Sequence, residues 1–96
     1  MRLEWSHFAL ADRDEIFDYI EADNPRAAVA VDDLISAQVQ LLIEFPEGGR
    51  VGRVPGTREL IISRTPYLVA YRVQDNTVRI LRVLHGSRQW PEDMPD

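Results

Sequence analysis

Beyond the first five residues, the spacing of apolar residues changes once along this chain, at the loop Pro46-Glu47-Gly48-Gly49. Before this loop, apolar residues recur at intervals of three and four, which is the period of a helix. After it, they alternate or form short β-branched runs between turn residues, which is typical of strands. A chain of 96 residues is long enough for one hydrophobic core, so both halves must share it. The sequence therefore predicts an α+β fold.

The N-terminal half predicts one strand and two helices. Residues 1–5 alternate between apolar and polar side chains, as a half-buried strand does. A first amphipathic helix is expected over residues 8–22. A second begins at Pro25, where Asn24 is suited to cap the N-terminus, and only Gln38 interrupts its apolar stripe. The short break between the two predicts an antiparallel two-helix hairpin.

The C-terminal half predicts a sheet. Residues 50–57 contain two glycines and a proline, which suits an irregular arm or a short edge strand. Three β-rich runs separated by short turns predict a three-strand antiparallel meander, with the helices packed on one face of the sheet: Arg58–Ser63, Tyr67–Val73 and Thr77–Leu84. We expect residues 1–91 to form a single domain and residues 92–96 to form a short acidic tail.

Charge is divided along the chain in a way that the net value of −5 conceals. Residues 1–49 carry −8, residues 50–90 carry +6, and the last residues carry −3. This division predicts two partners of opposite sign, or simply two solvated faces of different charge. All 11 basic residues are arginine, so no lysine is present to act as a base or form a Schiff base.

Several classes of site and location are not expected. The chain has no cysteine, and its two histidines lie 78 positions apart, so no metal-ligand spacing is present. The glycines match neither the Rossmann nor the P-loop pattern, so we expect no cofactor. The chain shows no signal-peptide pattern and no apolar run long enough to span a membrane. We therefore expect a cytoplasmic protein without a membrane partner.

Arginines of the C-terminal half form the first candidate site. Neighbouring strands lie about 4.8 Å apart, so several of these side chains would converge on one outer surface that binds phosphates or carboxylates. The set is Arg58, Arg64, Arg72, Arg79, Arg82 and Arg88. The alternation of side chains along a strand weakens this expectation for Arg82, because it places Arg82 on the same face as Val78, Ile80 and Leu84. The alternative is that these arginines are scattered over the surface and only keep the protein in solution. Trp90 fits a cap on the core better than a base-stacking platform.

His85 forms the second candidate site. Histidine changes charge near neutral pH, so it is a natural acid or base in RNA cleavage. That reaction also needs a cation for the phosphate oxygens, which Arg82 or Arg58 would supply, and Tyr67 or Tyr71 would provide a further proton-transfer group. The alternative is a histidine that ends a strand and is hydrogen-bonded for structural reasons.

Four segments together resemble the RelE/ParE superfamily of bacterial toxins from type II toxin–antitoxin systems. Tyr19-Ile20 with residues 24–28 is similar to the junction between the family's helices, and residues 53–60 to its entry into the meander. Residues 66–73 resemble its central strand, and residues 80–91 its C-terminal ending. The resemblance covers residues 1–91.

The resemblance implies a toxin that inhibits growth when free, that serves functions such as plasmid stabilisation, and that its antitoxin holds inactive in a hetero-oligomer. RelE-like members cut mRNA on the ribosome, whereas ParE-like members poison DNA gyrase and are not nucleases. Ribosome binding favours basic, lysine-rich chains, and this chain is acidic and has no lysine. We therefore expect a non-enzymatic, ParE-like gyrase inhibitor with a ParD-like antitoxin.

Two alternatives remain open. One is a ribosome-dependent endoribonuclease of the RelE type, with His85, Arg58 and Arg82 as its catalytic residues. The other is a toxin-like protein that has lost activity and only binds its antitoxin. In each case, the residues expected to contact the antitoxin or the target are Arg58, Arg64, Arg72, Arg82, Arg88 and Trp90.

Overall fold

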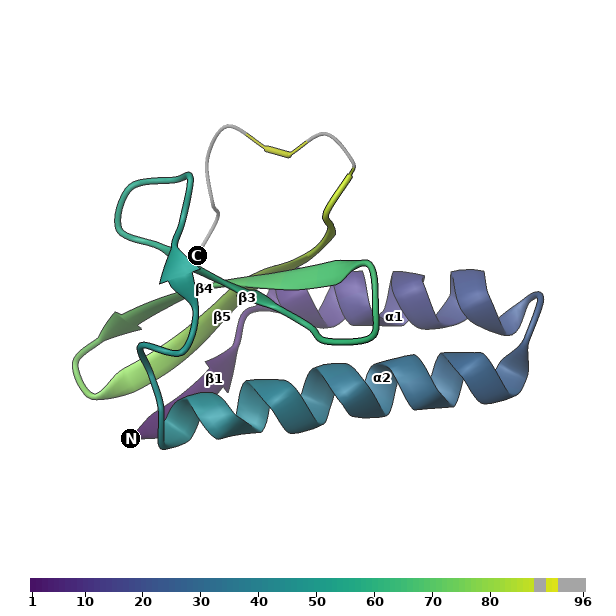
Figure 1. The fold of residues 1–96 in the computed structure, drawn as a ribbon, viewed down its shortest axis with the longest axis horizontal. Coiled ribbons are helices and arrows are strands. Elements are labelled where there is room, and N and C mark those ends of the chain that lie inside the picture. Colours follow the sequence, from purple (N-terminus) through teal and green to yellow (C-terminus); the bar gives the residue numbers. More distant parts are fainter. Residues whose placement is uncertain (88–89, 92–96) are drawn as a thin grey trace.

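The computed structural model describes residues 1–87 and 90–91. A strand comes first, followed by two helices, one turn of 3₁₀-helix and four further strands (Figure 1). The elements are β1 (Arg2–Trp5), α1 (His7–Glu21), α2 (Pro25–Gln40), η1 (Leu41–Ile43), β2 (Arg50–Val51), β3 (Arg58–Ile61), β4 (Tyr67–Gln74) and β5 (Thr77–His85). The predicted α+β fold is therefore confirmed, and β3, β4 and β5 form the predicted meander.

Both helices begin at side-chain caps. The Ser6 hydroxyl accepts a hydrogen bond from the backbone N–H of Ala9, and the Asn24 side chain accepts one from Ala27. These caps satisfy N–H groups that have no partner within a helix. In the part of the chain that the structure describes, neither helix has the length and apolar character needed to cross a membrane.

One arginine joins the N-terminal elements. Arg13 of α1 donates two hydrogen bonds to Asp32 of α2, at 3.0 and 2.8 Å. Its guanidinium also lies over the ring of Trp5 in β1, 4.6 Å from the ring centroid. A planar guanidinium suits both contacts, so this residue holds the helical hairpin against the first strand.

The five strands form one sheet in the order β1-β5-β4-β3-β2. β1 pairs with β5 in parallel, and all other neighbours are antiparallel. β2 is the short edge strand expected within residues 50–57. Asp75 and Asn76 between β4 and β5 both have positive φ, at 52° and 59°. This two-residue turn matches the right-handed twist of the strands that it joins.

The predicted alternation of β5 is wrong at one place. The register of β4 against β5 shifts between Ala70 and Tyr71, which leaves one extra residue in β5. Val78 and Ile80 pack into the main core, whereas Leu84 packs against the smaller cluster on the other face. A bulge resets the alternation of side chains. Arg82 therefore does not share a face with all three of these residues.

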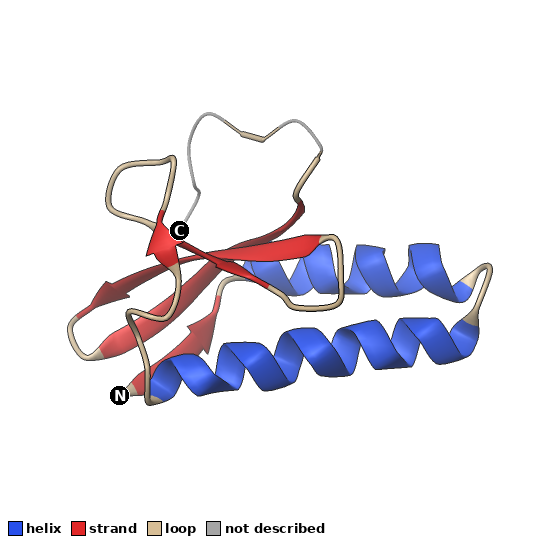
Figure 2. Cartoon of the chain, in the orientation of Figure 1, coloured by secondary structure: helices blue, strands red, loops and turns tan. Residues whose placement is uncertain are grey.

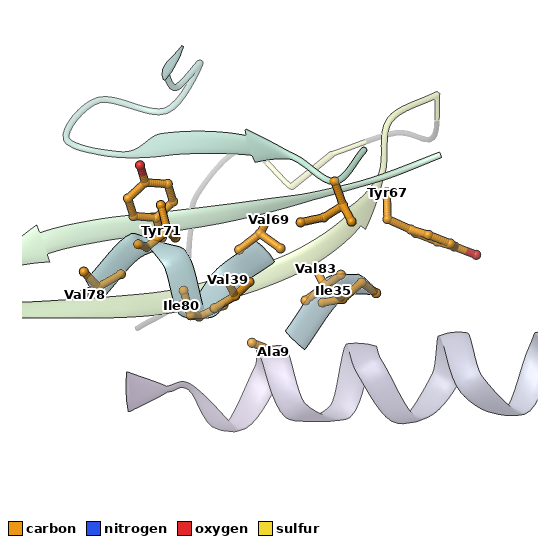
Figure 3. Close-up of a cluster of buried hydrophobic side chains, with 11 residues drawn as sticks. Ala9, Ile35, Val39, Tyr67, Val69, Tyr71, Val78, Ile80 and Val83 are labelled. Atoms are coloured by element: carbon orange, nitrogen blue, oxygen red, sulfur yellow. The ribbon is translucent and has the colours of Figure 1, made fainter. Parts of the chain in front are cut away.

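The main core lies between the sheet and the helical hairpin, which covers one face of the sheet (Figure 2). Tyr67, Val69 and Tyr71 of β4 belong to this core, together with Ile35 and Val39 of α2 (Figure 3). The opposite face of the sheet carries a smaller cluster of Ala70 and Leu81, on which Val54, Leu84 and Trp90 pack.

Gln38, the polar residue in the apolar stripe of α2, has a structural use. Its side-chain amide donates to the Ser63 carbonyl at 3.3 Å and accepts from the Ser63 N–H at 2.8 Å. Ser63 lies just beyond β3, past the two residues of β3 that β2 pairs with, so the glutamine satisfies backbone groups that the sheet does not cover there.

Candidate functional site: a cleft between α1 and the end of β5

A cleft opens between α1 and the C-terminal end of β5, with a volume of about 380 Å³. We call it the α1–β5 cleft. The first helix contributes both acidic and apolar side chains, and the strands contribute three of the residues that the sequence singled out, Tyr67, Arg82 and His85. The lining residues are Asp12, Glu15, Ile16, Tyr19, Tyr67, Arg82, Val83, Leu84 and His85.

Asp12 is the most heavily bonded side chain of the cleft. Its carboxylate accepts hydrogen bonds from Arg82 Nε at 2.7 Å, Arg82 Nη2 at 2.9 Å and the Val83 N–H at 2.9 Å. Only 8% of Asp12 is exposed. The hydrogen bond to Asp12 raises the pKa of Arg82 above its usual value. Arg82 is thus a permanent cation that is largely neutralised by α1.

His85 is held by its immediate surroundings. Its Nδ1 atom accepts from the Ser87 N–H at 3.2 Å and lies 2.9 Å from the Ser87 hydroxyl. The ring also meets Tyr67 edge to face, with centroids 5.5 Å apart. Because Nδ1 accepts from a backbone N–H, the neutral ring carries its proton on Nε2.

Arg58 and Tyr71 lie elsewhere, in a region that we call the Gly49 corner: Pro46, Gly49, Arg58, Glu59 and Tyr71. The Tyr71 hydroxyl donates to the Pro46 carbonyl and accepts from the Gly49 N–H, both at 2.8 Å. Arg58 Nη1 donates to the Gly49 carbonyl at 2.8 Å. Burial raises the pKa of Tyr71, so its hydroxyl stays neutral at physiological pH. The phenol and the guanidinium therefore have structural partners here.

The three candidate nuclease residues are not brought together. His85 and Arg82 line the α1–β5 cleft. Arg58 pairs in register with Tyr71, whereas His85 pairs with Tyr67. Those two tyrosines lie four residues apart on β4, or about 13 Å along the strand.

The other candidate arginines do not share one surface either. Arg64 is exposed in the turn after β3, with a φ of 72°. Arg72 and Arg79 lie opposite each other near the β4–β5 turn, and Arg79 is 3.5 Å from Glu4. Arg88 lies outside the described residues. The structure therefore brings Arg72 and Arg79 together, whereas Arg58 and Arg82 lie at the Gly49 corner and in the α1–β5 cleft.

Trp90 packs on the smaller cluster. Its predicted role as a cap on the core is therefore confirmed. The guanidinium of Arg53 lies 3.4 Å from the centroid of its ring.

Sequence reasoning missed two buried carboxylates. Asp12 was not singled out in the sequence, although its spacing of four from both Phe8 and Ile16 places it on their side of the helix. Glu59 is 3% exposed, accepts two hydrogen bonds from Arg50 and accepts the Arg53 N–H at 2.8 Å. Burial raises the pKa of Glu59, but these hydrogen bonds and the two positive charges outweigh burial and leave it lowered.

A comparison with protein families identifies the chain. Residues 3–90 match the model of the ParE toxin of the type II toxin–antitoxin system parDE. The chain belongs to the ParE toxin family. Among curated relatives, Y4kP of Sinorhizobium fredii is 44% identical over 91 residues, covering 95% of this chain and 94% of the relative. Toxin RelE2 of Caulobacter vibrioides is 37% identical over 84 residues, with 88% and 93% covered.

Solved structures agree with the membership in the ParE family. A chain of the chromosomal ParDE system from P. aeruginosa matches with a TM-score of 0.81 and 34% identity, covering 86% of this chain and 92% of that chain. A chain of the toxin–antitoxin complex RelBE2 from Mycobacterium tuberculosis matches with a TM-score of 0.56 and 28% identity, covering 88% and 95%. The fold of this ParE-family toxin is thus found in solved structures of a ParDE system and of a RelBE2 complex.

Proposed function

We infer that this toxin inhibits growth by binding DNA gyrase without catalysing a reaction itself, and that a ParD-like antitoxin neutralises it by direct binding. The observation that carries the inference is the separation of the residues that RNA cleavage would need. The ParE family model and the ParDE structural neighbour support it as well.

RNA cleavage needs a base, a cation and an acid within hydrogen-bond reach of a single phosphate. Arg58 is at the Gly49 corner, bound to a backbone carbonyl. Arg82 has two of its donors on Asp12, which reduces the positive charge available to a phosphate. His85 remains, but the arginine in its cleft is already bonded to a carboxylate, which makes the cleft a weak basis for a nuclease.

The alternative is a ribosome-dependent endoribonuclease of the RelE type. One observation favours it: His85, Arg82 and Tyr67 border the same cleft. Curated relatives that carry the name RelE are consistent with this reading too. The third possibility, a chain that only binds its antitoxin, predicts no growth arrest on induction.

Arginines on the surface of the sheet that the helices do not cover are proposed to contact a partner protein. Arg64 is exposed in a turn and Arg72 is half-buried on the face opposite the helices. We retain these two, together with Trp90 and Arg88, as candidate contacts with gyrase or with the antitoxin. Arg58 and Arg82 are weaker candidates because each binds a partner within the chain.

A matched pair of histidine variants tests the proposed function. His85→Ala removes the candidate acid or base, and His7→Ala removes the exposed histidine at the start of α1. If the toxin binds gyrase, both variants inhibit gyrase supercoiling with purified enzyme as the wild type does. If it is a nuclease, only His85→Ala loses ribosome-dependent mRNA cleavage, by about 10²- to 10⁴-fold. That second result would overturn the gyrase proposal.

A further inference from the structure

The end of the helical hairpin exposes two large apolar side chains. Phe45 is 61% exposed and Leu41 is 56% exposed. They lie where η1 continues α2, at the end of the hairpin away from the turn between α1 and α2 (Figure 1). The Phe45 N–H donates to the Leu41 carbonyl at 2.9 Å, so one helical turn separates them and their side chains share a face. Among residues 1–87 and 90–91, no other two exposed large apolar residues are four positions apart.

The backbone that carries Phe45 is held on both sides. Leu42, one residue after Leu41, is 2% exposed and belongs to the main core. The Pro46 carbonyl accepts from the buried Tyr71 hydroxyl at 2.8 Å, and the carbonyl of Phe45 itself accepts from a loop N–H at 2.9 Å. A contact made by a pre-organised side chain costs less conformational entropy than one made by a mobile loop. The phenylalanine ring is therefore an exposed apolar group on a fixed base.

Two exposed carboxylates, Glu44 and Glu47, flank this ring. Arg50, the nearest cation in the sequence, directs its guanidinium to Glu59 instead, with bonds of 3.2 and 3.0 Å. A hollow of about 510 Å³ lies here, and it is lined by Glu44, Phe45, Pro46, Glu47 and Gly48. We call the group of Leu41, Glu44, Phe45 and Glu47 the Phe45 surface. It has an apolar centre and a charged rim, which is the arrangement of protein-binding surfaces.

The charge of the Phe45 surface restricts what can cover it. A second copy in a symmetric dimer would bring the same two carboxylates of both chains together, which is repulsive. Anionic lipid headgroups are repelled for the same reason. A protein that presents an apolar patch with basic residues around it complements both the ring and the rim.

DNA gyrase, the target proposed above, has this chemistry. An enzyme that binds duplex DNA carries basic surfaces for the phosphate backbone. A toxin that acts by binding, without catalysis, also needs a contact surface on which a few large, pre-organised residues supply most of the binding energy. Phe45 meets this requirement because it is large, exposed and held by its backbone.

We propose that the Phe45 surface is a contact surface for DNA gyrase, with Phe45 and Leu41 against an apolar patch of the enzyme and the two glutamates against basic residues beside it. The inference rests on the proposed function, because the occupant is gyrase. It adds the place and the side-chain chemistry of that contact, and it locates the contact away from the α1–β5 cleft.

Two alanine variants test the apolar centre. Each full-length toxin is titrated against purified gyrase, and the concentration that halves supercoiling is measured. Phe45→Ala is expected to raise this concentration about tenfold or more, because it removes the central ring. The matched control is Val29→Ala. Val29 is 51% exposed on α2, about 18 Å along the helix from Leu41, so its replacement should leave the concentration unchanged.

Two charge reversals test the acidic rim. Glu44→Lys is expected to raise the half-inhibitory concentration about tenfold at low ionic strength, and the difference from wild type should shrink at high ionic strength, because salt screens the attraction. Asp33→Lys changes the net charge of the toxin equally at an exposed position of α2 outside the Phe45 surface. It should inhibit gyrase as the wild type does at both ionic strengths.

Two further measurements show that the variants are intact. Urea denaturation gives the stability of each variant, and calorimetry gives its Kd for the proposed antitoxin, the protein encoded by the adjacent reading frame. All four replaced side chains are exposed, so we expect both quantities to stay close to those of the wild type. A loss of gyrase inhibition with unchanged stability and unchanged antitoxin binding supports the inference.

Each failure has a separate meaning. If the wild type inhibits gyrase and neither Phe45→Ala nor Glu44→Lys is weaker than its control, the inference is wrong while the proposed function stands. If these two variants lose antitoxin binding but inhibit gyrase normally, the antitoxin covers the Phe45 surface and the inference is overturned. If the wild-type toxin does not inhibit gyrase at all, the inference fails together with the proposed function.

Discussion

The Gly49 corner and the α1–β5 cleft lie at different ends of the sheet and use similar residue types in opposite ways. At the corner, a tyrosine, an arginine and a carboxylate direct their polar atoms to groups of the chain itself. At the cleft, a tyrosine is 71% exposed and a carboxylate stands at the rim. The cleft also contains an internally bonded pair, Asp12 and Arg82, so the exposed tyrosine and the carboxylate at the rim are what distinguish it from the corner.

Packing explains why the two ends differ. At the corner, the loop before β2 lies so close to β4 that Gly49 has no room for a side chain: an added Cβ would be 2.7 Å from the Tyr71 ring. At the cleft, β1 ends at Trp5 and α1 departs from the sheet, so β5 loses its neighbour. Close packing fills the first end, whereas at the second end, among residues 1–87 and 90–91, α1 rather than a strand lies beside the last residues of β5.

Gly49→Ala is expected to have the largest effect of the variants that test this comparison. The new methyl group would meet Tyr71 Cε1 and hydroxyl oxygen at 2.7 Å and the Glu59 carbonyl at 2.8 Å. Neither the buried ring nor the backbone can move freely, so we expect the free energy of unfolding to fall by about 3 kcal/mol. Urea denaturation of the purified toxin measures this change.

Gly86→Ala, beside the end of β5, is the matched control. Its added Cβ would lie 3.5 Å from the Pro66 carbonyl and 3.9 Å from Leu68, which are ordinary contacts. We expect its unfolding free energy to stay close to that of the wild type. Equal losses for the two glycine variants would contradict the distinction between a closed and an open end.

The order of elements could be predicted from the sequence because it depends on local patterns. The change of period at Pro46, the cap at Asn24 and the turn at Asp75-Asn76 all act over a few residues. The parallel pairing of β1 with β5 joins residues more than seventy positions apart, and no local pattern specifies it. The cleft exists because of that pairing, so it could not be predicted either.

Side-chain roles were predictable only where alternation continued without interruption. Arg72 shares the outer face with Ala70 as expected, because the extra residue at the irregularity is in β5 and the alternation of β4 itself continues. Arg82 comes just after the irregularity in β5, and its partner Asp12 is 70 positions away. A single extra residue in a strand changes the direction of every side chain that follows, and the sequence of this strand does not mark it.

Tyr71→Phe should have an intermediate effect, and Tyr19→Phe is its control at the cleft. Removal of the Tyr71 hydroxyl leaves the Gly49 N–H and the Pro46 carbonyl without that partner. We expect a loss of about 1–2 kcal/mol in unfolding free energy. Tyr19 is exposed, and its hydroxyl can bond to water, so Tyr19→Phe should change stability very little. A similar loss in both variants would show that the corner is not the better-bonded end.

Glu59→Gln should have the smallest effect, and it should depend on pH. The partners of Glu59, the side chains of Arg50 and Arg53, are 54% and 51% exposed, so solvent screens much of the attraction. We expect the variant to be less stable than the wild type by about 1 kcal/mol or less at neutral pH. Urea denaturation between neutral and acidic pH measures the difference.

The sign of that pH dependence follows from the lowered pKa of Glu59. The ordinary value is 4.5, and the folded protein holds the carboxylate ionised to lower pH than the unfolded chain does. The stabilisation is therefore complete above about pH 4.5 and is lost as the pH falls through the folded-state pKa. Wild type and Glu59→Gln should converge in stability in acid, whereas wild type and the exposed-site control Glu21→Gln should not show this convergence. Parallel profiles for wild type and Glu59→Gln would mean that the buried carboxylate at the corner contributes no favourable charge interaction, and that its bond to the Arg53 N–H alone fixes the loop.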